Sequence, residues 1–238
     1  FRAYHSQLLK LQVEIAGKHD LIAVEENAVR NLFTSKVDLS KRRDAFSLGE
    51  RDTVLDQVDS APVLVHVAQA EAMKLPYEAI HRSVMKHLMD CATSEYLFIL
   101  VFFKGFSSEV FNNLFSRTLS LVLETLDGYL GNCHDIIGLL LLVKLTEAQG
   151  QVMARRQVPV LDSLLERINS MLWPRLKVVL ENNLKSVRQA QPKRRLGQGA
   201  DLHPHYTTRR YAELVASMHS LHVSDNVPTA TTTADAQG

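Results

Sequence analysis

The sequence predicts an all-α protein that folds as an elongated bundle or rod of helices. In the stretch Arg117–Lys144, apolar residues recur every seven positions in two interleaved series that make one seam on a helix. Further apolar positions beside the seam widen it, so helical neighbours are expected on more than one side. The stretch Val158–Val187 repeats the pattern and is the predicted packing partner. The two series are Leu119, Leu126, Cys133 and Leu140, and Val122, Tyr129, Ile136 and Val143.

The composition is ordinary for a soluble globular protein. The chain has 238 residues, of which 46% are hydrophobic and 22% charged, so most of it is expected to fold. The formal net charge of +1 removes the simplest argument for a nucleic-acid-binding protein, which usually has a strongly basic domain. The two most apolar runs, residues 96–103 and 136–143, are far shorter than the roughly 20 residues that cross a bilayer.

The first helix is predicted to begin at Phe1. Apolar residues follow three and four apart as far as Ile15, and the helix is expected to continue past Gly17 toward Val24. Because the sequence starts in helical register, we expect a fragment of a longer chain, with residues 1–222 forming one helical rod segment.

Helical periodicity disappears between Thr34 and Leu75, which predicts a long irregular connection. Such a connection is either flexible or held along the bundle as an extended strap. The alternation of Val63, Val65 and Val67 indicates short extended pieces within it.

The next helix is predicted to run from Pro76, which suits a first turn, to Gly105, which suits a C-cap. Ser107 and Ser108 then begin the helix that carries the central apolar seam. Glycines weaken this helix near Gly131, where it could break in two. Because the apolar register survives across that point, a continuous or mildly bent helix is favoured over a reversal.

Pro159 is predicted to open the partner helix, and the Trp173-Pro174 pair inside it predicts a kink or a break. Trp173 is interpreted as a core anchor, because its neighbours follow the apolar face. A last helix begins at Tyr206. Residues 223–238 are polar and low in complexity, so we expect a disordered tail. The apolar face of the last helix is Tyr211, Leu214, Val215, Met218 and Leu221.

A basic segment supplies the candidate partner-binding residues. Between Arg188 and Arg210, positive side chains outnumber the single acidic residue Asp201. This polarity suits contact with an acidic protein surface or anionic lipid headgroups, although a solvated loop beside a helix end has the same pattern. The candidates are Lys193, Arg194, Arg195, Arg209 and Arg210.

No motif predicts a catalytic, cofactor-binding or metal site. The pair His203 and His205, together with Asp201 or Asp135, defines the alternative of a helical metal-dependent hydrolase, but it lacks the separated ligand pairs of structural zinc sites. Cys133 and Cys91 are interpreted as small buried hydrophobic residues rather than as reactive thiols or a disulfide.

Several motifs, in the same order, resemble the vacuolar protein sorting-associated protein 52 family. They extend from the first residues to about Leu221. The series comprises LLKLQVEI (8–15), LGER (48–51), APVLV (61–65), PYEAIHRS (76–83), EYLF (95–98), RTLS with LDGYLGNCHD (117–135), VPVLD (158–162), LWPRL (172–176), SVR (186–188) and PHYTTRRYAE (204–213). The chain departs from the family pattern at residues 101–108 and after Leu221.

The resemblance implies a non-catalytic helical-rod subunit of the Golgi-associated retrograde protein tethering complex and of its endosomal recycling counterpart. It implies sister tethering subunits, SNARE proteins and a Golgi Rab-type GTPase as partners. It also implies a cytosolic protein that is peripheral on trans-Golgi network and endosome membranes. The alternative within binding proteins is a segment of another helical tether or of a Rab-effector adaptor.

Overall fold

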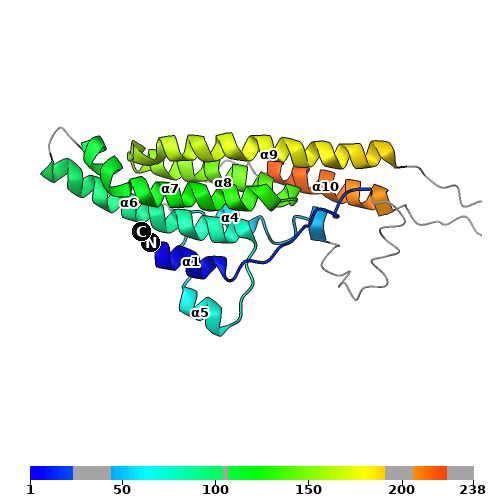
Figure 1. The fold of residues 1–238 in the computed structure, drawn as a ribbon, viewed down its shortest axis with the longest axis horizontal. Coiled ribbons are helices and arrows are strands. Elements are labelled where there is room, and N and C mark those ends of the chain that lie inside the picture. Colours follow the sequence, from blue (N-terminus) through cyan, green and yellow to red (C-terminus); the bar gives the residue numbers. More distant parts are fainter. Residues whose placement is uncertain (24–43, 104–106, 191–205, 224–238) are drawn as a thin grey trace, which may run out of the picture.

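Four long helices lie side by side along the length of the molecule (Figure 1). They are α6 (Tyr77–Phe102), α7 (Ser107–Asn132), α8 (Ile136–Arg155) and α9 (Asp162–Gln189). The computed structural model describes residues 1–23, 44–103, 107–190 and 206–223, and it forms no β-sheet within these ranges. The elongated all-α bundle predicted from apolar periodicity is confirmed.

Aromatic contacts show how α6 and α7 run. Tyr77 at the start of α6 stacks on Tyr129 near the end of α7, with 3.7 Å between ring centroids. Tyr96 near the end of α6 meets the edge of Phe111 near the start of α7, with centroids 6.3 Å apart. The two helices are therefore antiparallel.

The chain reverses direction between α7 and α8. Near the start of α8, Asp135 is joined to Glu78 at the start of α6 through Arg51, whereas Arg156 after the end of α8 donates to Thr93 Oγ1 farther along α6. Helix α8 is thus parallel to α6 and antiparallel to α7. The prediction of a continuous or mildly bent helix through residues 117–144 was wrong, and the break near Gly131 is observed.

Asp135 provides the physical reason for the reversal. Its backbone is extended, with φ −83° and ψ 101°, and its side chain accepts a hydrogen bond from the backbone N–H of Gly138 at 2.9 Å. Such a cap satisfies one of the free N–H groups at a helix start. The apolar seam keeps its register across residues 133–135 because both helices face the same core, so periodicity alone could not reveal the turn.

The first helix is much shorter than predicted. Helix α1 (Arg2–Leu9) ends well before Gly17, and the chain then pairs with the segment that leads into α6. Val13 N donates to Leu75 O at 2.9 Å, and Leu75 N donates to Leu11 O at 3.0 Å. These backbone bonds replace helical ones, so the prediction that the helix continues toward Val24 was wrong.

The long connection contains short helices. Residues 24–43 lie outside the described residues, and the rest forms η1 (Asp44–Phe46), α4 (Thr53–Asp56) and α5 (Val65–Ala70). The prediction of extended structure at Val63–Val67 was wrong, because α5 begins at Val65 and buries Val65 and Ala68 on one face. The connection is held to the bundle at Val63, whose N–H donates to Ser83 Oγ and whose carbonyl accepts from Tyr4 OH.

Helix α9 follows the turn η2 (Pro159–Leu161), as Pro159 predicted, and it continues through Pro174 without a break. Pro174 has no N–H to donate to the carbonyl of Ser170. Because Ser170 is exposed, water can hydrogen-bond to this carbonyl instead. Trp173 is 55% exposed, so its interpretation as a core anchor was wrong. Leu172 and Leu176 face the core instead.

Helix α10 (Tyr206–Val223) forms where predicted, but it is rotated so that only part of its predicted face is buried. Leu214 and Leu221 are buried as predicted, together with Ser217, whereas the predicted Tyr211, Val215 and Met218 are exposed. Ser217 explains the rotation, because its hydroxyl accepts from Leu48 N–H and donates to Phe46 O. The predicted tail beyond residue 223 lies outside the described residues.

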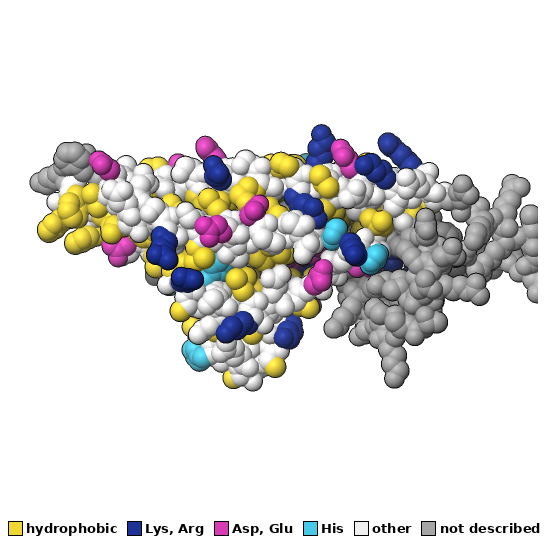
Figure 2. All heavy atoms as spheres, viewed as in Figure 1, with side chains coloured by type: hydrophobic (Ala, Val, Ile, Leu, Met, Phe, Trp, Pro, Cys, Tyr) yellow, Lys and Arg dark blue, Asp and Glu magenta, His cyan; other side chains and the backbone are white. Residues whose placement is uncertain are grey.

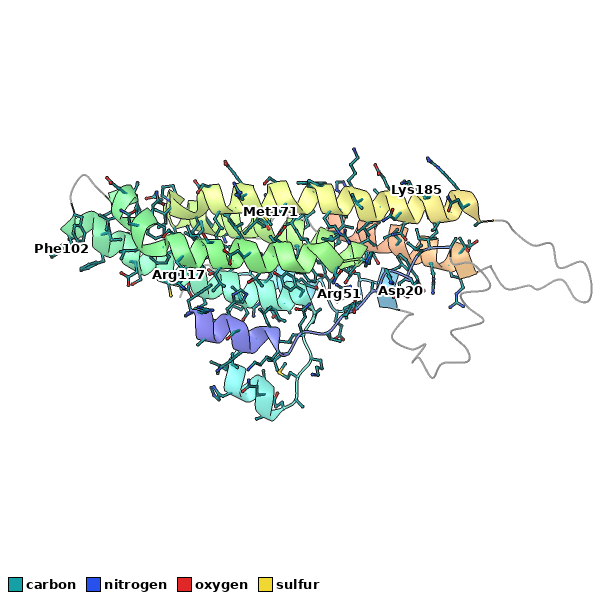
Figure 3. The ribbon with its side chains drawn as sticks, viewed as in Figure 1. Asp20, Arg51, Phe102, Arg117, Met171 and Lys185 are labelled. Atoms are coloured by element: carbon teal, nitrogen blue, oxygen red, sulfur yellow. The ribbon has the colours of Figure 1, made fainter. Side chains whose placement is uncertain are left out.

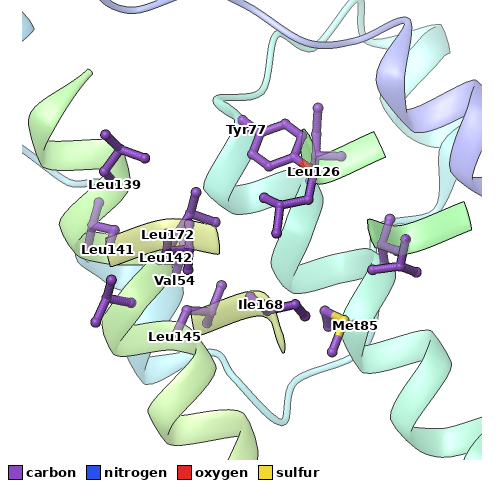
Figure 4. Close-up of a cluster of buried hydrophobic side chains, with 14 of the residues drawn as sticks. Val54, Tyr77, Met85, Leu126, Leu139, Leu141, Leu142, Leu145, Ile168 and Leu172 are labelled. Atoms are coloured by element: carbon purple, nitrogen blue, oxygen red, sulfur yellow. The ribbon is translucent and has the colours of Figure 1, made fainter. Parts of the chain in front are cut away.

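The core lies where the four long helices meet (Figure 4). Met85 of α6, Leu126 of α7, Leu142 of α8 and Ile168 of α9 are fully buried there. The pairing of α8 with α9 is the most extensive in the described bundle, and α7 also contacts α9. The predicted packing of residues 117–144 against residues 158–187 is therefore confirmed, although residues 117–144 belong to two helices. By length and composition α8 could also cross a membrane, but 67% of its most apolar window is buried inside the bundle, which accounts for its apolar character.

One buried histidine makes the fold sensitive to acid. His81 of α6 is 3% exposed, and its Nε2 has no hydrogen-bond partner among the described residues. Burial lowers the pKa of the His81 imidazole to about 4, and the neighbouring His5 lowers it further in the same direction. Between pH 6.5 and 4 the unfolded chain therefore binds a proton that the folded chain does not, so the stability falls as the pH falls through this window.

We expect His81→Leu to remove most of this pH dependence. Because the pKa of His81 is lowered to about 4, the parent chain loses roughly 3 kcal/mol of stability between pH 6.5 and 4. Urea unfolding at a series of pH values would measure it. His66→Leu, at an exposed position of α5, should keep the parental slope, and an unchanged slope in the His81 variant would contradict the assignment.

Candidate partner-binding surfaces

A buried cluster of charges joins the connection to the starts of α6 and α8. Arg51 Nε donates to Glu78 Oε1 at 2.6 Å, and its Nη2 donates to Asp135 Oδ2 at 2.6 Å. The side chains of Glu78 and Asp135 are only 1% and 6% exposed. Figure 3 labels Arg51 where the connection meets the long helices.

Each member of the cluster depends on the others. Burial alone would lower the pKa of the Arg51 guanidinium, but Asp135 and Glu78 outweigh it and hold the pKa above its usual value. Burial raises the pKa of the Glu78 carboxyl, and the charge of Arg51 opposes that rise. The cluster thus fixes one helix to another. Asp135 is committed to Arg51 and to the cap of α8, so it is not free to bind a metal.

The other residues of the alternative hydrolase site, Asp201, His203 and His205, lie outside the described residues. Within the described ranges, no three His, Cys, Asp or Glu side chains are grouped so that they could hold a metal ion.

The most buried thiol is poorly suited to nucleophilic chemistry. Cys133 lies on a pocket of about 420 Å³ between the segment 12–16 and the end of α7, and its Sγ is 3.2 Å from Tyr129 OH. Burial raises the pKa of the Cys133 thiol to about 11, so it is protonated at neutral pH, whereas a nucleophilic cysteine needs the thiolate. Cys133 is a buried residue as predicted, while Cys91 is half-buried, and both thiols are free.

The basic candidates separate into distinct groups. Lys193, Arg194 and Arg195 lie outside the described residues. Arg209 is exposed on α10 and available to a partner. Arg210 is half-buried, and its Nη1 donates to Leu21 O at 2.7 Å while its guanidinium carbon lies 5.9 Å from the centre of the Phe46 ring. Arg210 therefore helps to fasten α10 to the rest of the fold.

Sequence reasoning missed a cluster of exposed apolar residues on the described bundle. Figure 2 shows hydrophobic side chains gathered at the end of the α6–α7 pair, where Figure 3 labels Phe102. We call this surface the apolar tip. It consists of Leu97, Phe98, Leu100, Val101, Phe102 and Phe103 of the α6 end, with Leu114 of α7, each at least 41% exposed. The signal was present in the uninterrupted run LFILVFF, which is apolar on every side of a helix and cannot be buried by one neighbour.

These observations define a class of protein. The described bundle uses its charged groups to hold helices together, keeps its buried thiol protonated and exposes apolar and basic side chains on helix surfaces. It is an all-α helical rod that carries exposed apolar and basic side chains on its helices.

The chain belongs to the family whose model is described as "Vps52, C-terminal", which matches residues 1–234. It is 40% identical over 223 residues to vacuolar protein sorting-associated protein 52 A of Arabidopsis thaliana, covering 94% of this chain and 31% of the relative. The human vacuolar protein sorting-associated protein 52 homolog is 40% identical over 227 residues, covering 93% of this chain and 31% of the relative. The Schizosaccharomyces pombe protein is 25% identical over 214 residues, which covers 87% of this chain and 41% of the relative.

The chain thus spans about a third of the length of the plant and mammalian relatives that it matches. No solved structure matches it. The family resemblance inferred from ordered motifs is confirmed, and with it a place among proteins named for vacuolar protein sorting.

We expect Arg51→Met to destabilise the fold strongly. The change leaves Glu78 and Asp135 buried without their shared cation, and breaking a buried ion pair in this way costs about 3–5 kcal/mol. The free energy of unfolding in urea would measure the loss. Arg117→Met, at an exposed position of α7 (Figure 3), is the matched control and should change stability by less than about 0.5 kcal/mol. Equal effects of the two substitutions would show that the cluster contributes nothing.

Proposed function

We propose that this chain is a non-catalytic, scaffolding segment of a vesicle-tethering complex subunit that acts in retrograde transport from endosomes to the trans-Golgi network. The family match over residues 1–234 is the observation that carries the proposal. The fold supports it, because a rod of long helices offers extended faces to other proteins. Since the same fold class serves many purposes, the exposed surfaces rather than the fold connect this chain to binding.

The partners that we propose are sister tethering subunits, SNARE proteins, a Golgi Rab-type GTPase and an anionic membrane surface. The protein would be cytosolic and peripheral on trans-Golgi network and endosome membranes. The half-exposed Trp173 supports protein contacts in particular, because large aromatic side chains contribute much of the binding energy at interfaces. Arg209 supports contact with an anionic surface.

A transport assay would test the proposed function. In cells depleted of the full-length protein, we expect a cargo that cycles between endosomes and the trans-Golgi network to accumulate in endosomes. Re-expression of the full chain should restore its return, and a full chain carrying Arg51→Met, which destabilises this segment, should restore it poorly at elevated temperature. Arg117→Met in the full chain should restore it fully. Normal cargo return in depleted cells would contradict the proposal, as would co-purification with exocyst-type subunits instead of retrograde-complex subunits.

Arg209→Glu tests the basic candidates without disturbing the fold. We expect it to weaken binding to vesicles that contain phosphatidylserine by about five-fold or more, because one basic residue near an anionic surface contributes about 1 kcal/mol. The melting temperature should not change, since Arg209 is exposed. Co-sedimentation with the vesicles would measure binding.

Arg117→Glu, which makes the same charge change on α7, serves as the control and should bind like the parent. A substitution that includes Arg210 would confuse the result, because that side chain fastens α10 to Leu21. Equal binding by the Arg209 and Arg117 variants would show that the described part of the basic segment is only a solvated surface.

A further inference from the structure

The α6–α7 pair projects beyond the rest of the bundle. Arg156, just after the end of α8, contacts Thr93 and Asp90 of α6, so α8 ends beside this point. Helix α6 nevertheless continues to Phe102, and the pair forms the free end seen in Figures 1 and 3. In its last turns α6 contacts α7, where Tyr96 meets the edge of the Phe111 ring.

That contact buries only one side of the α6 end. Ile99 is buried, and Tyr96 packs on Phe111. The other sides carry apolar residues, of which Val101 is 76% exposed and Phe102 is 68% exposed. Apart from Leu114, the exposed residues at the start of α7 are mostly polar, among them Glu109, Asn112, Asn113 and Ser116. Because a helix that is apolar all round is normally buried, the α6 side of the tip requires a cover.

The register of α6 indicates where this cover lies. Lower on α6, Ser83 and His87 face α1, where Tyr4 OH lies 3.0 Å from Ser83 Oγ and the Phe1 ring stacks on His87 with centroids 5.9 Å apart. At about 100° per residue, Phe98 lies within about 20° of His87 around the helix, and Leu97 and Val101 lie within about 40° of Ser83 and His87 respectively. The exposed residues Leu97, Phe98 and Val101 therefore lie on the same face of α6 that α1 covers nearer the start of the helix.

Helix α1 points toward the tip. The segment just after α1 pairs with Leu75, before the start of α6, whereas Tyr4 reaches Ser83 and Phe1 reaches His87. The two helices are antiparallel, so the amino-terminal end of α1 is the end nearest to the tip. At 1.5 Å per residue, Phe98 lies about 16 Å beyond His87, a distance that about 11 more residues of helix would span.

We propose that the apolar tip is covered by the polypeptide that precedes Phe1 in the full-length protein, as a helix that prolongs α1 along α6. The relatives provide room for such a segment, because the matching family model is described as C-terminal and this chain covers 31% of the plant and human proteins. The segment has an apolar stripe at spacings of three and four residues, which faces Leu97, Phe98 and Val101, and a polar outer side. The tip is then an internal packing surface that ties the preceding part of the chain to this bundle.

Comparing two chain lengths tests the proposal. Val101→Glu is made in the chain that starts at Phe1 and in the full-length chain. At an exposed position the substitution should move the melting temperature by no more than about 1 °C, whereas at a position covered by a helix it should lower it by more than about 6 °C. We expect the small shift in the chain that starts at Phe1 and the large one in the full-length chain. Asn112→Glu, on the polar face of α7, should have the small effect in both.

Hydrogen exchange provides a second measurement. The amides of residues 97–103 should exchange at least ten-fold more slowly in the full-length chain than in the chain that starts at Phe1. Equal exchange and equal small shifts in both chains would overturn the proposal. It would also be overturned if the tip pairs with a second copy, seen as a dimer of the shorter chain that Val101→Glu dissociates, or if the tip of the full-length chain is protected only when phosphatidylcholine vesicles are added.

Discussion

Arg51 holds two carboxylates that belong to different long helices. Glu78 lies in the first turn of α6 and Asp135 immediately precedes α8, and both are almost completely removed from water. Neither carboxylate would be stable there as an anion without a shared cation, because an unpaired buried charge costs several kcal/mol. Since Arg51 comes from the connection before α4, one guanidinium fixes three parts of the chain that are far apart in the sequence.

The close approach at this cluster also explains a glycine. A side chain at Gly138 would place its Cβ 2.8 Å from Asp135 Oδ2 and 2.9 Å from Arg51 Nη2. From the sequence, glycine in this helix seemed only to weaken it. In the fold, the missing side chain of Gly138 makes room for the ion pair between Arg51 and Asp135 and for the cap of α8. The glycine that weakens α8 therefore allows Arg51 to connect α6 with α8.

The two ends of α6 differ in chemical character, because one carries a buried charge and the other carries exposed apolar side chains. The start of α6 carries Glu78 in the buried charge cluster, whereas its last turns carry exposed phenylalanines. The ion pairs at the first end join the connection to α6 and α8. The exposed apolar residues at the second end leave surface for further packing. Among the described residues, the buried thiol of Cys133 is protonated at neutral pH, and Asp135 accepts hydrogen bonds from Arg51.

The sequence by itself determined the helical class, the long apolar stripes and most helix starts, because 3.6-residue periodicity, prolines and the residues next to helix ends act locally. It also determined the family, through short motifs in a fixed order. The tertiary structure alone decided that the chain reverses at residues 133–135, that α1 ends at Leu9, that Trp173 is exposed and that Arg210 contacts Leu21. Periodicity states that a face is buried but not which neighbour buries it. The pairing of Arg51 with Asp135, of Leu75 with Val13 and of Ser217 with Phe46 brings together residues that are far apart in the chain, and only folding selects such partners.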